Sequence, residues 1–337
     1  MDRRREPRKL EGMTEFATDF VPGPLDRDAT VYIAGHRGLV GGAIWRKMQA
    51  EGFSDLVGKS HSELDLTDRR AVFDYVTGIK PKYLVLAAAK VGGIMANNTY
   101  PVDFISENLQ VQVNVLDAAL EAGVERVLFL GSSCIYPGQA QQPIKEEYLL
   151  TGHLEPTNDA YAIAKIAGIL QIQAVRRQYG LPWISAMPTN LYGPGDNFSP
   201  QGSHVLPALI RRYDEAVRLG AGSVTNWGTG SPRREFLHVD DMASACIYLL
   251  ENYDGAAQVN VGTGTDVTVK EVAETIAKVV GFDGETEWDT SKPDGTAQKR
   301  LDVTKLSEAG WRSAISLDEG IRTTVEWYRE HIGELRE

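Results

Sequence analysis

The fold is decided by residues 30–48, which read TVYIAGHRGLVGGAIWRKM. An apolar run rich in β-branched residues comes first, then a turn with glycine at positions 35, 38, 41 and 42, then a stretch of helical character. Glycines let the backbone turn tightly and approach a pyrophosphate, and the free N–H groups and dipole at a helix start attract its charge. This order of strand, turn and helix predicts a dinucleotide site.

Apolar runs alternate with helical stretches over the following 150 or so residues. The runs cover 30–34, 82–88, 126–131 and 183–187, and the helical stretches lie near 39–51, 67–78, 102–122 and 159–179. Such alternation is typical of βαβ units, so we expect an α/β protein with a Rossmann-type doubly wound parallel sheet. Ligands of such sheets bind at the carboxyl ends of the strands.

Beyond residue 188 the chain is richer in glycine and proline, and helical stretches return near 203–219 and 268–280. We expect a smaller, interleaved C-terminal α/β domain that binds the substrate. The predicted division is a disordered leader at 1–28, a cofactor domain at 29–188 to which 236–265 return, and a substrate domain at 189–235 and 266–337.

Composition limits the class of protein. The chain has 337 residues, 42% of them hydrophobic, and a net charge of -11, which argues against a nucleic-acid surface. Cys134 and Cys246 are its two cysteines, so a disulfide framework is excluded and a reducing compartment is expected. No signal peptide or 18-residue apolar run is found, which predicts a cytoplasmic protein without a membrane partner.

A candidate reaction centre lies in residues 158–165, which read NDAYAIAK. Tyr161 and Lys165 are one helical turn apart, and Ser132 ends an apolar run upstream. An adjacent ammonium favours the phenolate, so the tyrosine pKa should fall below its usual value of about 10, and the phenol could exchange a proton with a sugar oxygen. The alternative is that the pair merely shares a helix face; the glycine turn and Ser132 favour the reaction centre.

The glycine spacing together with this Tyr-x-x-x-Lys pattern resembles the extended short-chain dehydrogenase/reductases. Six further motifs, spread over most of the chain from residue 30 to about 325, resemble the GDP-L-fucose synthase family. They are AKVGGI at 89–94, GSSCIYP at 131–137, EPTN at 155–158, PTNLYGP at 188–194, SHVLPAL at 203–209 and REFLHVDD at 234–241.

The resemblance implies a reaction and a set of roles. This family epimerises C3 and C5 of GDP-4-keto-6-deoxy-D-mannose and then reduces C4 with NADPH, giving GDP-L-fucose. Tyr161 and Lys165 would be the reductase pair, Ser132 their hydroxyl partner, and Cys134 and His204 the epimerase base and acid. The resemblance also implies a homodimer, formed through the helices at 102–122 and 159–179.

The residues themselves suit this chemistry. Protons on C3 and C5 are acidified by the C4 ketone, so one group that removes and one that returns a proton can invert both centres through an enolate. A thiol near cations is a usable base, and histidine is a natural acid near neutral pH. The alternatives are that Cys134 is a small buried hydrophobe and His204 a helix cap; Cys246, on a helix, is assigned to packing.

The choice of nicotinamide cofactor depends on the end of the second strand. Cationic and polar groups suit the 2′-phosphate of NADP(H), and Arg37, Lys59 and His61 supply them, whereas Asp65 leaves NAD open. We expect NADP(H). The residues expected to bind it are Gly35, His36, Arg37, Gly38, Leu39, Val40, Gly41, Lys59, His61, Asp65, Leu66, Ala88, Lys165, Pro188, Thr189, Asn190, Leu191 and His204.

A nucleotide diphosphate needs cations. The resemblance places Arg212, Arg234 and Lys299 in this role, with Trp227 lining the pocket and Asp294 touching the substrate; the alternatives are a surface pair and a core tryptophan. No metal is expected. Two rival functions stay open, another NDP-sugar epimerase or dehydratase, and a non-catalytic NADP(H)-sensing protein.

Overall fold

The computed structural model describes residues 20–200, 202–292 and 294–334. Its centre is a six-stranded sheet in the order β10-β5-β4-β3-β1-β2, in which every pairing is parallel. The strands are β1 (Val31–Ala34), β2 (Leu56–Val57), β3 (Tyr83–Leu86), β4 (Arg126–Leu130), β5 (Ile184–Pro188) and β10 (Val259–Val261). The predicted doubly wound α/β fold is confirmed.

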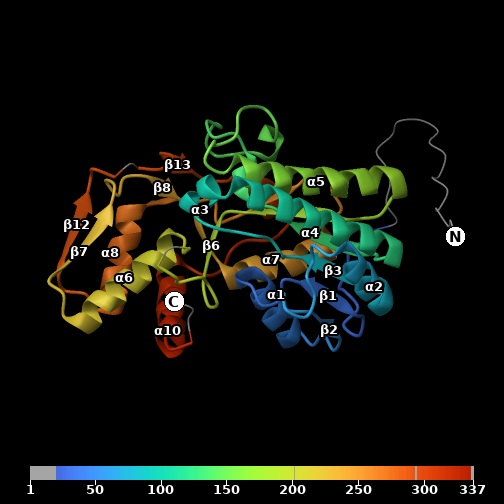
Figure 1. Cartoon of the computed structure of the whole chain (residues 1–337), viewed down its shortest axis with the longest axis horizontal. Coiled ribbons are helices and arrows are strands. Elements are labelled where there is room, and N and C mark those ends of the chain that lie inside the picture. Colours follow the sequence, from blue (N-terminus) through green and yellow to red (C-terminus); the bar gives the residue numbers. More distant parts are fainter. Residues whose placement is uncertain (1–19, 201, 293, 335–337) are drawn as a thin grey trace.

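Helices cover both faces of this sheet (Figure 1), which is why its strands are mostly apolar. On one face Tyr32 packs with Leu116 of α4, and on the other Ile33 packs with Ile44 of α1 and Met242 of α7. The covering helices are α1 (Leu39–Ala50), α2 (Arg69–Ile79), α4 (Pro101–Ala122), α5 (Asp159–Tyr179) and α7 (Val239–Asn252).

A second core lies at the other end of the molecule (Figure 1), where Leu209, Ile276 and Val325 pack together. The helices around it are α6 (Val205–Leu219), α8 (Val269–Val280) and α10 (Leu317–His331), beside the paired strands β7 (Ser223–Trp227) and β12 (Glu285–Asp289). Two small sheets join the two ends. They contain β8 (Arg233–Arg234), β11 (Val267–Thr268) and β13 (Gln298–Lys299), and β6 (Asn190–Tyr192) with β9 (Phe236–His238).

The remaining elements are short. They are α3 (Ile94–Thr99), α9 (Thr304–Glu308) and the 3-10 turns η1 (Ser133–Ile135) and η2 (Glu146–Tyr148). Among the described residues, no helix is both long and apolar enough to cross a membrane.

The predicted leader needs a correction. Residues 1–19 lie outside the described residues, but residues 20–28 pack against the folded chain. Leu25 is buried, its amide donates to the Glu251 carboxylate at 3.0 Å, and Arg27 pairs with the same carboxylate at 2.9 Å. Burial of Leu25 and these long-range polar contacts hold this segment on α7, and neither is visible in local composition.

Candidate active site

A glycine turn follows β1, as predicted. Gly35 has φ +89°, and a Cβ there would lie 2.7 Å from the amide nitrogen of Ala88 at the end of β3. A Cβ on Gly41 would lie 2.1 Å from the Gly35 carbonyl oxygen. Helix α1 begins after Gly38 with no side-chain cap, so its first N–H groups are left for a ligand. This cradle fits the pyrophosphate of a dinucleotide.

Beside this turn lie the cationic residues predicted for the 2′-phosphate. The His36 ring lies against Gly58, where an added Cβ would come within 2.5 Å of Nδ1. Arg37, Lys59 and His61 are all exposed. The turn and the end of β2 are therefore neighbours in space.

Two carboxylates, Asp65 and Glu63, lie in this region. Asp65 accepts hydrogen bonds from the amide and hydroxyl of Thr67. Glu63 accepts hydrogen bonds from the Ser60 hydroxyl and, at 2.8 Å, from the Ser60 amide, and these two hydrogen bonds are the main reason that the pKa of Glu63 falls to about 2; Lys59, 3.5 Å away, adds a smaller effect. The spacing from Ser60 to Glu63 is that of a capping box, and it is the sequence signal for the hydrogen bonds between these two residues.

The other cofactor candidates lie on the sheet and at its edge. The Leu66 carbonyl accepts from Asn114 at 3.0 Å, and the Thr189 amide donates to the Val261 carbonyl at 3.0 Å. Pro188 ends β5, and Asn190 and Leu191 lie in β6, where the side-chain amide of Asn190 donates to the main-chain carbonyl of Glu235 at 2.8 Å. The buried Glu235 side chain accepts from the amides of Gly264 and Leu301. Glu235 belongs to the REFLHVDD motif, but local sequence does not indicate these long-range contacts.

The tyrosine, lysine and serine of the predicted reaction centre meet at the carboxyl end of β4. Tyr161 and Lys165 lie on α5, and the Ser132 side chain hydrogen-bonds Tyr161. The buried Lys165 ammonium donates to the Leu130 carbonyl at 2.9 Å and lies 5.9 Å from the centre of the Tyr161 ring. The Phe104 and Tyr161 rings are in a T-shaped contact, with ring centres 6.4 Å apart.

The expected lowering of the tyrosine pKa is wrong for the protein in this state. Burial, and secondarily the nearby Cys134, raise the pKa of Tyr161, and the Ser132 hydrogen bond offsets this only in part. Burial also lowers the pKa of Lys165 to about 8. The cause is desolvation, which disfavours both charged forms and which a helical spacing does not reveal. Tyr161 is therefore a neutral phenol at neutral pH and can donate its proton.

Cys134 lies in η1, two residues beyond Ser132, and is partly exposed. Two donors face its sulfur atom: the Asn158 side-chain amide at 3.5 Å and the Lys299 ammonium at 3.6 Å. The sequence placed Asn158 in a motif but gave it no role. Cys246 is fully buried on α7, where burial raises the pKa of its thiol.

His204 is linked to this group indirectly. It precedes the first residue of α6 and is exposed, and desolvation by the surrounding protein lowers its pKa. A Cβ on Gly93 would lie 3.9 Å from the Ser203 carbonyl, and one on Gly92 would lie 2.9 Å from the Phe104 ring. The loop at 92–93 thus approaches both the residue before His204 and the ring that packs on Tyr161.

The predicted substrate residues form a chain of contacts that leads to Cys134. Arg212 donates to the Asn226 side chain at 2.7 Å, and Trp227, 67% exposed, is the next residue. Asp294 accepts from the Thr229 amide at 2.9 Å.

The chain of contacts continues through Arg234. Its positive charge is near Asp294. In the sheet it is the register partner of Lys299, whose ammonium faces Cys134. Residues far apart in the sequence are thereby arranged along one path.

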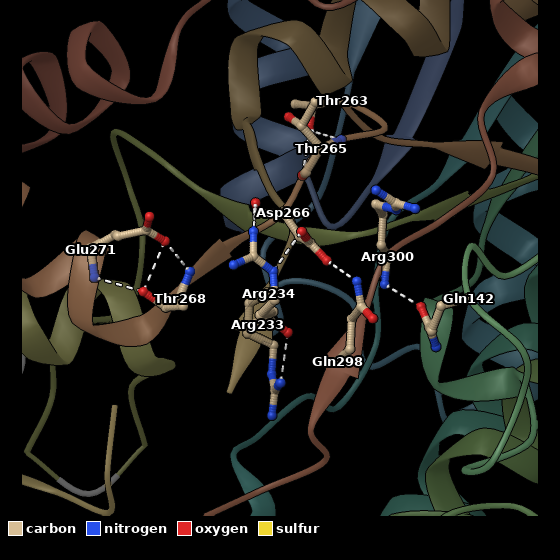
Figure 2. Close-up of polar contacts among 10 residues, drawn as sticks. All are labelled: Gln142, Arg233, Arg234, Thr263, Thr265, Asp266, Thr268, Glu271, Gln298 and Arg300. Atoms are coloured by element: carbon tan, nitrogen blue, oxygen red, sulfur yellow. Dashed lines mark hydrogen bonds and ion pairs between the residues drawn. The ribbon is translucent and has the colours of Figure 1, made fainter. Parts of the chain in front are cut away.

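A polar network holds the strand that carries Lys299 (Figure 2). Asp266 accepts from Arg233 at 2.9 Å and from the Gln298 side chain, and the Arg300 amide donates to Gln142 at 2.8 Å. Both neighbours of Lys299 in the sequence are therefore fixed, one through its side chain and the other through its backbone. Among the described residues, no group of three or more His, Cys, Asp or Glu side chains could hold a metal ion.

Comparison with known proteins agrees with this arrangement. The model of the NAD dependent epimerase/dehydratase family matches residues 31–262. That match covers the glycine turn, the tyrosine helix and the returning strand β10.

Two curated relatives and one solved structure narrow the class. GDP-L-fucose synthase 1 of Arabidopsis thaliana is 56% identical over 95% of this chain and 99% of its own. GDP-L-fucose synthase of Escherichia coli (strain K12) is 52% identical over 89% of this chain and 97% of its own. A crystal structure of a GDP-L-fucose synthetase from Naegleria fowleri bound to NADP matches with TM-score 0.86 and 27% identity over 94% of this chain and 98% of its own. The chain therefore belongs to the NAD dependent epimerase/dehydratase family and, within it, to the GDP-L-fucose synthase group.

Proposed function

We propose that this protein converts GDP-4-keto-6-deoxy-D-mannose to GDP-L-fucose by epimerising C3 and C5 and then reducing C4 with NADPH. The observation that carries the proposal is the meeting of Ser132, Cys134, Tyr161 and Lys165 at one strand end, with a cysteine that faces two donors. The names of the relatives and the NADP bound to the Naegleria fowleri enzyme support it.

The reduction uses the neutral Tyr161. When bound, NADPH supplies the hydride to C4. Tyr161 gives its proton to the C4 oxygen as the carbonyl becomes an alcohol, and its raised pKa keeps that proton available. Lys165 would hold the nicotinamide ribose, and its charge stabilises the phenolate left after transfer.

The epimerisation uses Cys134 and His204 on opposite faces of the sugar. The Cys134 thiolate removes the proton at C3, and the C–H electron pair passes to the C4 oxygen as an enolate that Ser132 and Tyr161 stabilise. His204 returns a proton to the other face. Cys134 then gives its proton to solvent and His204 takes one up from solvent, so that the same two steps can invert C5. Its lowered pKa makes His204 a ready donor when protonated.

The path of contacts beyond Cys134 suits the nucleotide. Arg212, Arg234 and Lys299 supply cations for the diphosphate, and the exposed Trp227 offers an aromatic face. Asp294, near Arg234, would orient that guanidinium and touch the substrate.

We also propose that the chain has two domains and forms a homodimer. Residues 29–188 and 236–265 would bind the cofactor, and 189–235 and 266–337 the substrate. A homodimer through α4 and α5 is supported by exposed apolar residues on both helices: Val113, Ile163 and Leu170 are 38%, 42% and 42% exposed. The two free cysteines support a reducing, cytoplasmic setting.

The test is to supply GDP-4-keto-6-deoxy-D-mannose and NADPH and to identify the sugar by NMR. GDP-L-fucose is expected. A different 4-keto product with no NADPH consumed, or tightly held NAD in the purified protein, would favour another NDP-sugar epimerase or dehydratase. Binding of NADPH with no turnover of any nucleotide sugar would favour the sensing protein.

A further inference from the structure

The Lys299 ammonium, proposed above to bind the diphosphate, also contacts the sulfur of Cys134. The Nζ to Sγ distance is 3.6 Å, although 165 residues separate the two in the sequence. A cationic donor at this range stabilises a thiolate more than a thiol, because only the thiolate carries charge.

The position of this ammonium is built into the fold. Gln298 is tied to Asp266, as Figure 2 shows, and the Leu301 amide donates to the buried Glu235 carboxylate at 2.8 Å. Ile144 pairs with the backbone on the other side, since its amide donates to the Arg300 carbonyl at 2.8 Å. Lys299 is thus held between two fixed neighbours.

The other groups around Cys134 do not supply this charge. Tyr161 faces the thiol from α5 as a neutral phenol, since burial raises its pKa. Lys165, on the same helix, donates to the Leu130 carbonyl. Asn158 contributes a neutral donor at 3.5 Å. Among the described residues that donate to this sulfur, Lys299 is the cation.

We propose that Lys299 is a positioning residue that holds Cys134 as the thiolate base, a role that rests on the proposed epimerisation. The S–H bond breaks and its proton goes to solvent before the sugar reacts. The thiolate then takes the proton at C3, an S–H bond forms, and the C–H electron pair moves to the enolate oxygen. Lys299 would therefore act in the epimerisation as well as beside the diphosphate.

The experiment measures how fast iodoacetamide alkylates Cys134 as a function of pH, with no substrate present. Cys246 is fully buried, so Cys134 is the accessible thiol, and Cys246→Ala serves as the control that leaves the signal unchanged. In Lys299→Met the midpoint of the rate profile should move to higher pH by about one unit or more, the effect expected for losing an opposite charge at this range. Alkylation below the midpoint should be about tenfold slower.

Lys299→Arg should restore the wild-type midpoint, which a purely structural role of the lysine would not require. Circular dichroism and NADPH binding check that each variant is folded, and Lys299→Gln is the second neutral variant if Lys299→Met does not fold. An unchanged midpoint in a folded neutral variant would overturn the proposal. The assay uses no sugar, so a shifted midpoint supports the role of Lys299 even if the proposed reaction fails. An unchanged midpoint would overturn the role of Lys299 but not the proposed reaction.

Discussion

The Lys165 ammonium donates a 2.9 Å hydrogen bond to the main-chain carbonyl of Leu130, the last residue of β4. The lysine that lies one helical turn from Tyr161 is therefore also fastened to the sheet. Its charge is buried, and burial lowers its pKa to about 8. This has a measurable consequence for stability.

The folded chain binds the Lys165 proton less tightly than the unfolded chain, where lysine has its ordinary pKa of 10.5. The unfolded state thus holds more protons between these two pKa values, and stability rises with pH across that window. Lys165→Met removes this pH-dependent contribution to the free energy of unfolding. The difference in stability between Lys165→Met and wild type should therefore favour the variant by about 3 kcal/mol more at pH 7 than at pH 10.5. Urea unfolding at both pH values measures the free energy of unfolding of variant and wild type. Lys278→Met, at an exposed lysine, is the control. If the variant differs from wild type by the same amount at both pH values, the prediction is contradicted.

Tyr161→Phe should lower the rate of NADPH oxidation by about 100- to 10,000-fold, because only the proton donor is lost. The ring and its edge contact with Phe104 are kept, so fold and cofactor binding should persist. Steady-state kinetics and fluorescence titration with NADPH measure the two effects. Tyr179→Phe, at the exposed end of the same helix, should behave as wild type. Substantial turnover by the Tyr161 variant would remove the assigned role.

Cys134→Ser should stop exchange of the C3 and C5 protons with solvent deuterium, since a serine hydroxyl is far too weak a base at neutral pH. Slow reduction by Tyr161 and NADPH should continue and give an unepimerised GDP-6-deoxy-hexose. NMR of the sugar formed in deuterated water distinguishes the products. GDP-L-fucose labelled at both carbons would show that another group is the base.

His204→Gln should retain exchange at one carbon, because Cys134 can still remove a proton whose replacement on the opposite face fails. The same NMR measurement applies. Cys246→Ala is the control, since that thiol is buried on α7 away from the site. Full labelling at both carbons in His204→Gln would assign the acid to another residue.

Arg37→Gln should narrow the preference for NADPH over NADH in kcat/KM by about tenfold or more, the worth of one charge-assisted hydrogen bond. Arg37 is exposed beside the glycine turn and is free to meet a 2′-phosphate. Arg46→Gln, on the following helix and paired with Asp240 at 3.5 Å, is the matched control. Equal kcat/KM for both cofactors in the wild type would refute the assignment.

Glu235→Gln should destabilise the fold by about 1–3 kcal/mol, because an amide offers one acceptor where two backbone N–H groups now donate to a buried carboxylate. Glu271→Gln is the comparison, since Glu271 also accepts a backbone N–H but is exposed. Chemical denaturation measures both. A smaller loss for Glu235→Gln than for Glu271→Gln would show that this carboxylate does not tie the strands together.

The sheet, its helices and the glycine turn could be predicted because their signals are local. Apolar periodicity fixes the type of each element, and glycine at 35 is required where an added Cβ would strike the backbone that follows β3. The Tyr161 and Lys165 pair was equally readable, since helical spacing alone places the two side chains together. Family resemblance added the reaction and the substrate residues.

Only the tertiary structure decided the pKa values of buried groups and the contacts between segments that are distant in the sequence. The pKa of Tyr161 is raised instead of lowered, because burial is a property of the whole fold. Residues 20–28 pack on α7 through Leu25 and Glu251, 226 residues apart in the sequence. Lys299 reaches Cys134 because β13 is tied to its neighbours by Asp266 and Glu235. A sequence states which groups are present, but desolvation and distance are set only when the chain has folded around them.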